Sequence, residues 1–335
     1  MKRAINTTTA FGFILALGVG VGIVSQKYLD VSAQVGNLMK RMGIYHYFYA
    51  PTAVLKERLA PVLIPDAAQG KLNLYVLVGQ SNMVGMSEVP KGFEPPENVY
   101  TFGNDYQWHQ ATSPVDSAVG QIDSVSADEE AGFGPAIAFA QSRIAANPDQ
   151  PIGLIPCAKS GSSITQWAKS LSDHSLYGSC LKRVRAASTM GTVSGILFFQ
   201  GEADTIDPKQ FPSLSPAADA WAEKFATFAY NFRQDIGNPG TPLVYAQLGQ
   251  PDDLQGLPNW ALVQEQQVNI QIPNAKMIET NDLPMAGIHY TPDSYVTIGQ
   301  RFAEAIGQIG GEIGTTAPTD LEPASEDSLA PEPVQ

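Results

Sequence analysis

Five apolar segments recur along the middle of the chain, and polar residues separate them from one another. They span residues 72–78, 152–156, 194–199, 243–247 and 276–279. Short, continuous apolar runs of this kind are typical of strands that are buried on both faces of a parallel sheet. The pattern therefore predicts five parallel strands.

Segments with helical periodicity lie between these runs and after the last one. They cover residues 135–146, 175–188, 217–235, 260–270 and 292–309. Alternating strands and helices predict βαβ units, with helices on both faces of the sheet. We therefore expect an α/β domain over residues 70–310, with three α/β/α layers around a mostly parallel five-stranded sheet. Ligands of such sheets bind beyond the carboxyl ends of the strands.

The two ends of the chain have a different character. Lys2 and Arg3 precede an apolar run at 10–24, which is the pattern of an export signal. Two outcomes stay open: an uncleaved membrane anchor over residues 7–24, or a signal within residues 1–33 that is cleaved near Ala33. Both predict an exported, periplasmic or otherwise extracytoplasmic protein, which the anchor would tether to the membrane.

Two further segments flank the predicted domain. Residues 34–69 are interpreted as a stalk or a strap over the domain. Residues 311–335 are rich in Pro and acidic residues, and we expect them to be disordered. That tail carries six of the acids behind the formal charge of −13, which leaves −7 for the rest of the chain. A negative surface argues against nucleic acid as a partner, because binding phosphates requires basic residues.

Cysteine and histidine are scarce. Cys157 and Cys180 are the two cysteines, and we expect two buried thiols, although an oxidising compartment would permit one bridge. No metal-binding spacing occurs among these residues and the four histidines. The sequence therefore predicts neither a metal nor a cofactor.

Candidate chemistry follows the strands. Ser81 lies in a tight turn after the first strand, where it is a nucleophile if a base meets it, or else the N-cap of the next helix. After the third strand, Gln200 offers a side-chain N–H to an oxyanion, and Glu202 a carboxylate to orient a histidine. Alternatively, the acids of this loop cap the next helix. His289 lies in a loop between a strand and a helix, which favours a role as a base.

Five motifs occur in order over residues 70–309: Gly79-Gln80-Ser81-Asn82-Met83, Gly134-Pro135 with Phe139-Ala140, Gly161-Ser162-Ser163-Ile164 with Trp167, Gln200-Gly201-Glu202-Ala203-Asp204, and Gly287-Ile288-His289. Together they resemble the SGNH-hydrolase superfamily, in particular its sialate O-acetylesterase and acetyl xylan esterase-like branch (carbohydrate esterase family 6).

The resemblance implies a role for each matching position. Ser81 would be the nucleophile and His289 the general base. The oxyanion hole would consist of the backbone N–H groups of Ser81 and Gly161 and the side chain of Gln200, with help from Gln80.

One position departs from the family pattern. Family members commonly carry an acid three residues before the histidine, where this chain has Ala286. Glu202 is the first substitute, and Asp282 and Asp293 are alternatives. A Ser–His dyad supported by a backbone carbonyl is a further possibility.

These observations predict a serine esterase that removes O-acetyl groups from carbohydrate. A carbohydrate-binding protein of the same fold is the alternative, with Trp108 and Trp167 lining a sugar cleft. The predicted tether also leaves acylated exopolysaccharide or lipid open as a substrate.

Overall fold

The computed structural model describes residues 58–313, except residues 124 and 210–211. The predicted signal or anchor, residues 34–57 of the predicted stalk or strap, and the predicted tail from residue 314 onward lie outside the described residues. Within the described part, none of the helices has both the length and the apolar character needed to cross a membrane.

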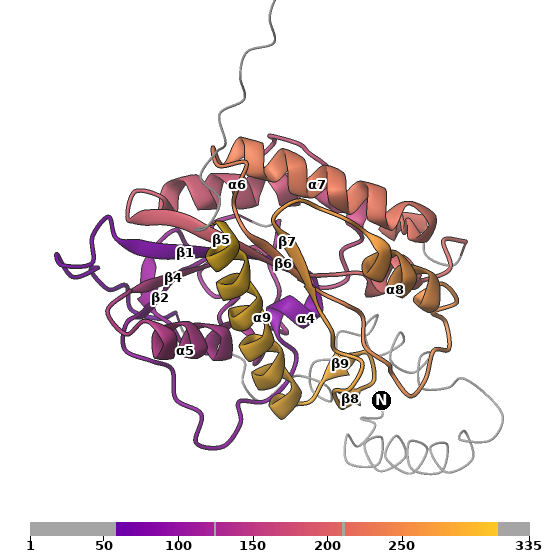
Figure 1. The fold of residues 1–335 in the computed structure, drawn as a ribbon, viewed down its shortest axis with the longest axis horizontal. Coiled ribbons are helices and arrows are strands. Elements are labelled where there is room, and N and C mark those ends of the chain that lie inside the picture. The colour runs from indigo at the N-terminus through magenta and orange to yellow at the C-terminus, as the bar shows by residue number, and fades with distance from the viewer. Residues whose placement is uncertain (1–57, 124, 210–211, 314–335) are drawn as a thin grey trace, which may run out of the picture.

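A seven-stranded sheet forms the centre of the molecule, in the spatial order β3-β2-β4-β1-β5-β6-β7 (Figure 1). Its strands are β1 (Leu72–Gly79), β2 (Val99–Phe102), β3 (Trp108–Gln110), β4 (Ile152–Pro156), β5 (Gly191–Phe199), β6 (Leu243–Ala246) and β7 (Ala275–Ile278). All neighbouring strands are parallel except β3, which pairs antiparallel with β2. The five predicted strands are thus confirmed as β1, β4, β5, β6 and β7.

The expected number of five strands was wrong, because β2 and β3 extend one edge of the sheet. They have only four and three residues, and a polar turn separates them. Runs this short carry no periodicity that distinguishes a strand from a loop. Numbered by their place in the chain, the five predicted strands have the spatial order 2-1-3-4-5. The second strand is added on one side of β1 and the later strands on the other, so the strand order reverses between β1 and β5.

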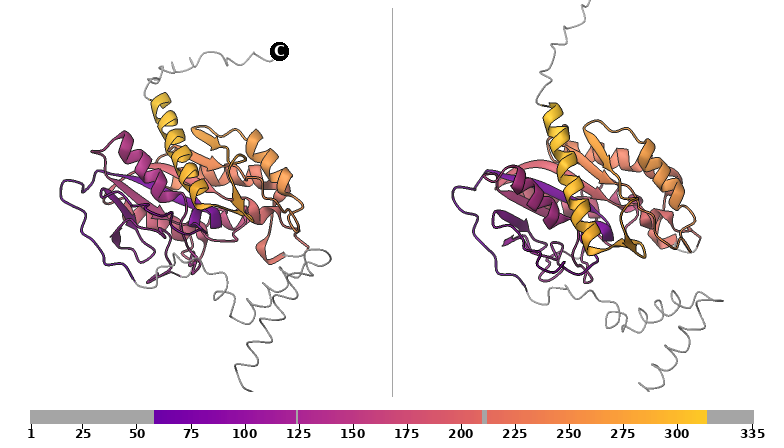
Figure 2. Two further views of the ribbon diagram at one scale, coloured as in Figure 1. Left: turned by 90° about the horizontal axis from the view of Figure 1, so that it is seen from below. Right: turned by 60° about the horizontal axis from the view of Figure 1, so that its bottom comes forward.

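Helices cover both faces of the sheet, as predicted. They are α4 (Ser81–Val84), α5 (Ala136–Ala146), α6 (Leu176–Ala187), α7 (Trp221–Asp235), α8 (Trp260–Asn269) and α9 (Pro292–Ile313). Four 3₁₀ turns, η1 to η4, span Ile164–Trp167, Glu202–Thr205, Pro212–Leu214 and Ala218–Ala220. The helices α6, α7 and α8 lie on one face, whereas α5 and α9 pack together on the other (Figures 1 and 2).

Alternation along β1 produces two hydrophobic cores. Leu74, Val76 and Val78 face the core under α6, α7 and α8. Tyr75 and Leu77 face the core under α5 and α9. Because successive side chains of a strand point to opposite faces, a central strand needs apolar residues at every position. This requirement explains why β1 is a continuous apolar run.

A disulfide joins the end of β4 to α6. Cys157 and Cys180 are bonded, with their Cα atoms 5.3 Å apart and a sequence separation of 23. The expectation of two free thiols was therefore wrong, because sequence spacing does not reveal the Cα separation that a bridge requires. The bridge fixes the loop that follows β4 to the helix above it.

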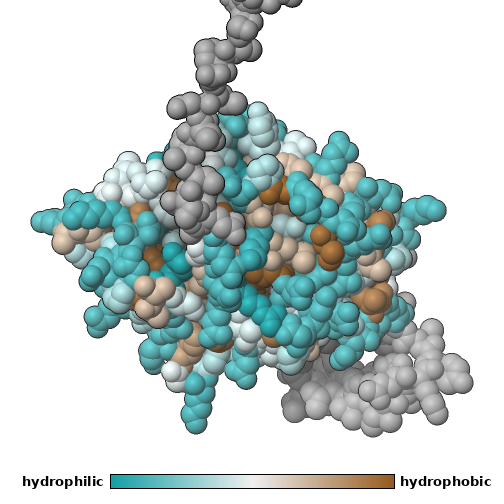
Figure 3. Space-filling model, viewed as in Figure 1, coloured by the Kyte–Doolittle hydropathy of each residue, from teal (hydrophilic) through white to brown (hydrophobic). Residues whose placement is uncertain are grey.

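The described part of the predicted strap lies against the edge of the sheet. The backbone N–H of Val62 donates to the Trp108 carbonyl over 2.8 Å, and Ile64 is buried. On the side of the molecule that carries α9, the surface is mainly hydrophilic, with hydrophobic residues in small separate spots (Figure 3).

Candidate active site

The turn after β1 places Ser81 at the carboxyl edge of the sheet, where the strand order reverses. Gly79 has φ of +140°, and a Cβ atom there would lie 2.0 Å from the Phe199 carbonyl oxygen of β5. Only glycine permits this approach. The next residue, Gln80, donates its backbone N–H to the same carbonyl over 2.8 Å. The turn is therefore locked to β5, and Ser81 begins α4 directly above it.

Ser81 and His289 lie in contact although they are 208 positions apart in the sequence. The Ser81 Oγ and the His289 Nε2 are 3.0 Å apart, which is hydrogen-bonding distance. The interpretation of Ser81 as an N-cap was wrong, since Gln80 occupies that position and no side chain caps α4. The Ser81 hydroxyl is thus directed to an imidazole.

His289 lies in a two-stranded hairpin of β8 (Met285–Ala286) and β9 (His289–Tyr290), in which Ala286 pairs directly with it. Burial lowers the pKa of His289 to about 4, and the negative charge of Asp128 opposes this shift. A neutral imidazole at physiological pH has a ring nitrogen free to accept a proton. The environment therefore suits His289 to act as a base.

Glu202, the first candidate for the orienting acid, contacts a different residue. Its Oε1 accepts a hydrogen bond from the Asn82 side-chain amide, and Oε2 is buried without a partner in the described structure. No hydrogen bond joins Glu202 to His289 within the described residues. Burial raises the pKa of Glu202 to about 7. The expected direct contact between Glu202 and His289 is thus absent from the described residues, and Glu202 reaches the histidine hairpin only through Asn82.

Asn82, which the sequence reasoning overlooked, connects Glu202 to the histidine hairpin. Its Nδ2 donates to Glu202 and, over 3.0 Å, to the backbone carbonyl of Ile288, the residue before His289. Its Oδ1 accepts from the Tyr295 hydroxyl over 2.7 Å. Asn82, Glu202 and Tyr295 are at most 2% exposed. This buried amide network holds the hairpin beside Ser81 and is the nearest replacement for an acid at position 286.

The two alternative acids lie away from the imidazole. Asp282 forms an ion pair with Arg301, with Oδ2 and Nη2 2.6 Å apart, and this bond lowers the Asp282 pKa. Asp293 is exposed in the first turn of α9. Neither hydrogen-bonds to His289 in the described part of the chain, so both expectations were wrong. The backbone carbonyl of Ile288 accepts a hydrogen bond from Asn82 and lies in the same hairpin as His289.

Gln200 is enclosed rather than directed at a ligand. Its Nε2 donates to the Ser162 carbonyl over 3.0 Å and to Asp204 Oδ2 over 2.6 Å, and its Oε1 accepts from Trp221. The amide has two N–H bonds, and both are in use. The expectation that Gln200 donates to an oxyanion was therefore wrong. Its hydrogen bonds instead join the loops that follow β4 and β5.

Gln80 has a similar bridging position. Its Oε1 accepts from the backbone N–H of Ala203 over 3.1 Å and of Gly201 over 3.4 Å. Asp204 accepts the backbone N–H groups of Ile164, at the start of η1, and of Ala217, just before η4. These contacts set the shape of the rim around Ser81.

Two predicted backbone donors are free. Among the hydrogen bonds of the described residues, the N–H groups of Ser81 and Gly161 have no acceptor. Gly161 has φ of +70° and is exposed on the loop after β4. Free backbone N–H groups beside a nucleophile are the usual components of an oxyanion hole.

The two tryptophans expected to line a sugar cleft are core residues. Trp167 is fully buried, and its Nε1 donates to Ser162 Oγ over 3.1 Å. Trp108 is 9% exposed and packs on Phe102 in the edge strands. Neither offers a ring face to a sugar, so this expectation was wrong.

Comparison with known proteins shows the family to which the chain is similar. A family model described as "Carbohydrate esterase, sialic acid-specific acetylesterase" matches residues 71–308. A protein of Arabidopsis thaliana named "Probable carbohydrate esterase" is 26% identical over 255 residues, which cover 69% of this chain and 89% of the relative.

Solved structures share the fold. An Arabidopsis thaliana structure matches with a TM-score of 0.59 and 22% identity, over 70% of this chain and 98% of that one. The carbohydrate acetylesterase XAC1771 of Xanthomonas citri matches with a TM-score of 0.51 and 18% identity, over 72% and 56% of the two chains. NanS matches with a TM-score of 0.52 and 15% identity, over 73% and 99%.

Proposed function

Because this chain belongs to the sialic acid-specific acetylesterase family of carbohydrate esterases and is a carboxylic ester hydrolase, we propose that it removes O-acetyl groups from carbohydrate through Ser81 and His289. The observation that carries the mechanism is the 3.0 Å distance between Ser81 Oγ and His289 Nε2. A serine and a neutral imidazole in contact form the minimum device for acyl transfer.

The reaction proceeds in two halves. In the first, Ser81 Oγ attacks the acetyl carbonyl carbon while its proton moves to His289 Nε2. The imidazolium then returns the proton to the sugar oxygen as the ester bond breaks, which leaves an acetyl group on Ser81. In the second half, His289 takes a proton from water as the oxygen of that water attacks the acetyl group, and the imidazolium then gives the proton to Ser81 Oγ as acetic acid leaves.

The charge that develops on the carbonyl oxygen is stabilised by the N–H groups of Ser81 and Gly161. Neither group has another acceptor in the described structure, so no existing hydrogen bond has to break when the oxyanion forms. Asn82 keeps the imidazole in place through the Ile288 carbonyl. Its role is positional, since it contacts the hairpin and not the reacting atoms.

We place this activity outside the cytoplasm. The basic start and apolar run of residues 1–24 support export. The disulfide between Cys157 and Cys180 is also typical of proteins in oxidising compartments.

Labelling with a fluorophosphonate tests the proposal, because only an activated serine reacts with the probe. We expect the full-length chain to hydrolyse p-nitrophenyl acetate and to incorporate one probe molecule at Ser81, with activity lost in proportion to labelling. Mass spectrometry of the labelled peptide identifies the site. A chain that neither reacts nor hydrolyses the ester would instead support the carbohydrate-binding alternative.

The acid side of the pH profile is a second test. Only neutral His289 accepts the Ser81 proton, and burial lowers its pKa to about 4. We therefore expect kcat/KM for p-nitrophenyl acetate to persist through mildly acidic pH and to fall only near pH 4. Intrinsic fluorescence at each pH shows whether the chain stays folded. A half-maximal rate near pH 6.5, the ordinary value for histidine, would contradict the buried, neutral base.

A further inference from the structure

A pocket of about 440 Å³ lies within the loop that connects the edge strands to α5. Residues between Pro114 and Ala131 line it, among them the three acids Asp123, Asp128 and Glu129. The volume falls in the range of sites that bind small molecules, and about 300 Å³ is the lower end of that range.

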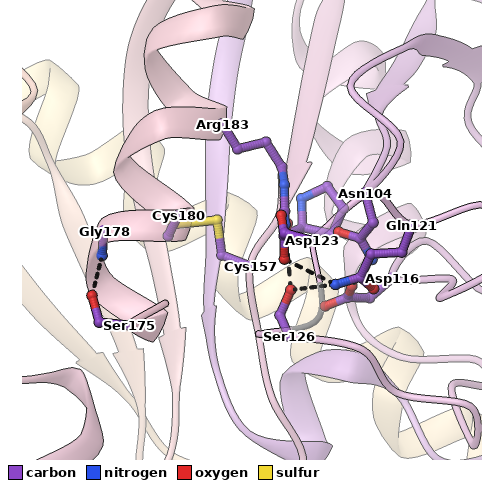
Figure 4. Close-up of a disulfide and its surroundings, with 11 residues drawn as sticks. Asn104, Asp116, Gln121, Asp123, Ser126, Cys157, Ser175, Gly178, Cys180 and Arg183 are labelled. Atoms are coloured by element: carbon purple, nitrogen blue, oxygen red, sulfur yellow. Dashed lines mark hydrogen bonds and ion pairs between the residues drawn. A yellow bond between two sulfur atoms is a disulfide. The ribbon is translucent and has the colours of Figure 1, made fainter. Parts of the chain in front are cut away.

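A fully buried arginine, Arg183 of α6, anchors the wall of this pocket. Arg183 of α6 donates to Asp123 Oδ2 over 3.0 Å and to Ser126 Oγ over 3.3 Å. Gln121 adds a bond to Asp123 Oδ1 over 3.1 Å. Figure 4 shows these side chains converging next to the disulfide that joins α6 to β4. These contacts tie the loop to α6, so the protein's own side chains hold the pocket wall in place.

The same wall reaches the proposed oxyanion hole. Asp128 Oδ2 accepts the backbone N–H of Ser160 over 2.9 Å, and Ser160 immediately precedes Gly161. Asp128 is also the carboxylate whose charge acts on His289. The contact with Ser160 places the pocket wall next to the loop that carries Gly161, a proposed oxyanion donor.

Charge sets which sugars the pocket favours. Neither lysine nor arginine is among its described lining residues. Arg183 has no exposed side-chain surface and is paired with Asp123. Lys159 donates its Nζ to the carbonyl of Ala127, so one positive charge lies at the pocket wall, where the lining acids Asp123, Asp128 and Glu129 outnumber it. Asp128 and Glu129 are left without an ion pair in the described structure, and carboxylates accept hydrogen bonds from hydroxyl groups but repel other carboxylates.

We propose that the pocket between Pro114 and Ala131 is the glycan subsite of this enzyme, and that it selects O-acetylated sugars without a carboxylate over acidic sugars. The proposal rests on the esterase function proposed above. It assigns Asp128 and Glu129 to the recognition of sugar hydroxyls.

Charge reversal at Glu129 tests the subsite. Glu129 is exposed, so its replacement by lysine leaves the core intact. We measure kcat/KM of the full-length chain for an O-acetylated methyl glucoside and for 9-O-acetyl-N-acetylneuraminate. The wild type should prefer the neutral sugar, and Glu129→Lys should shift the ratio toward the acidic sugar by about two- to fivefold, the upper part of the range for an exposed charge interaction. High salt should reduce the shift.

Asp149→Lys provides the matched control. Asp149 is exposed near the start of β4, at the opposite edge of the sheet, and the substitution changes the net charge by the same amount. If both variants shift the ratio equally, or if the wild type prefers the acidic sugar, the subsite proposal is wrong while the esterase function stands. If the wild type does not hydrolyse p-nitrophenyl acetate, the proposed function fails and the subsite proposal with it.

Discussion

Ser81→Ala is expected to lower kcat/KM for p-nitrophenyl acetate by about 10⁴- to 10⁶-fold, and His289→Ala by a similar factor. The alanine variant has no oxygen to attack the ester, and the histidine variant has no group to accept the serine proton. The two side chains are 3.0 Å apart and act as one unit. The double variant should therefore be no slower than either single variant.

A serine elsewhere provides the control. Ser142 lies on α5, and its hydroxyl donates only to the Ala138 carbonyl one helical turn away. Ser142→Ala should keep wild-type kinetics. Thermal unfolding curves establish that each variant is folded at the assay temperature. Multiplicative losses in the double variant, or more than about 1% of activity in either single variant, would contradict a serine and a base that act together.

Asn82→Ala should have the second largest effect, with kcat lowered about 100-fold and KM changed less than twofold. The substitution removes the donor to the Ile288 carbonyl and the partner of Glu202, while Ser81 and His289 stay present. Displacement of a catalytic group by about 1 Å is enough for a loss of this size. Binding of the acetyl ester does not involve Asn82, so KM should hardly change.

Two companion variants separate positioning from general destabilisation. Tyr295→Phe removes only the hydrogen bond to Asn82 Oδ1, and we expect a loss in kcat of about tenfold or less. Asn98→Ala changes an exposed asparagine near the start of β2, far from the site, and should be neutral. Both are assayed well below their unfolding temperatures. Equal kcat for Asn82→Ala and the wild type would eliminate the positioning role.

The local pattern of apolar and polar residues predicted much of the fold. The five parallel strands were visible because a strand covered by helices on both faces must be apolar throughout, as β1 is. The helices were visible through their 3.6-residue period. The strands β2 and β3 were not predicted, because short edge strands need neither long apolar runs nor strict alternation.

The motifs identified the reacting pair but not its supports. A serine after β1 and a histidine before α9 reach the same edge of a parallel sheet by topology alone. Asn82 adjoins the serine in sequence, yet nothing local indicates that its amide faces Glu202, Ile288 and Tyr295. Gln200 was misjudged for the same reason, since two of its partners, Ser162 and Trp221, come from the loop after β4 and from the start of α7.

The amino-acid sequence by itself determined the order of five of the strands and of the main helices, the candidate serine and histidine, and the missing acid at Ala286. Tertiary structure alone decided that Glu202 binds Asn82, that Cys157 and Cys180 are bonded, and that Asp128 joins a pocket to the oxyanion loop. The physical reason is the distance along the chain over which each kind of interaction acts. Periodicity and turn chemistry act over a few residues, whereas a hydrogen bond between loops depends on how the whole sheet places their ends.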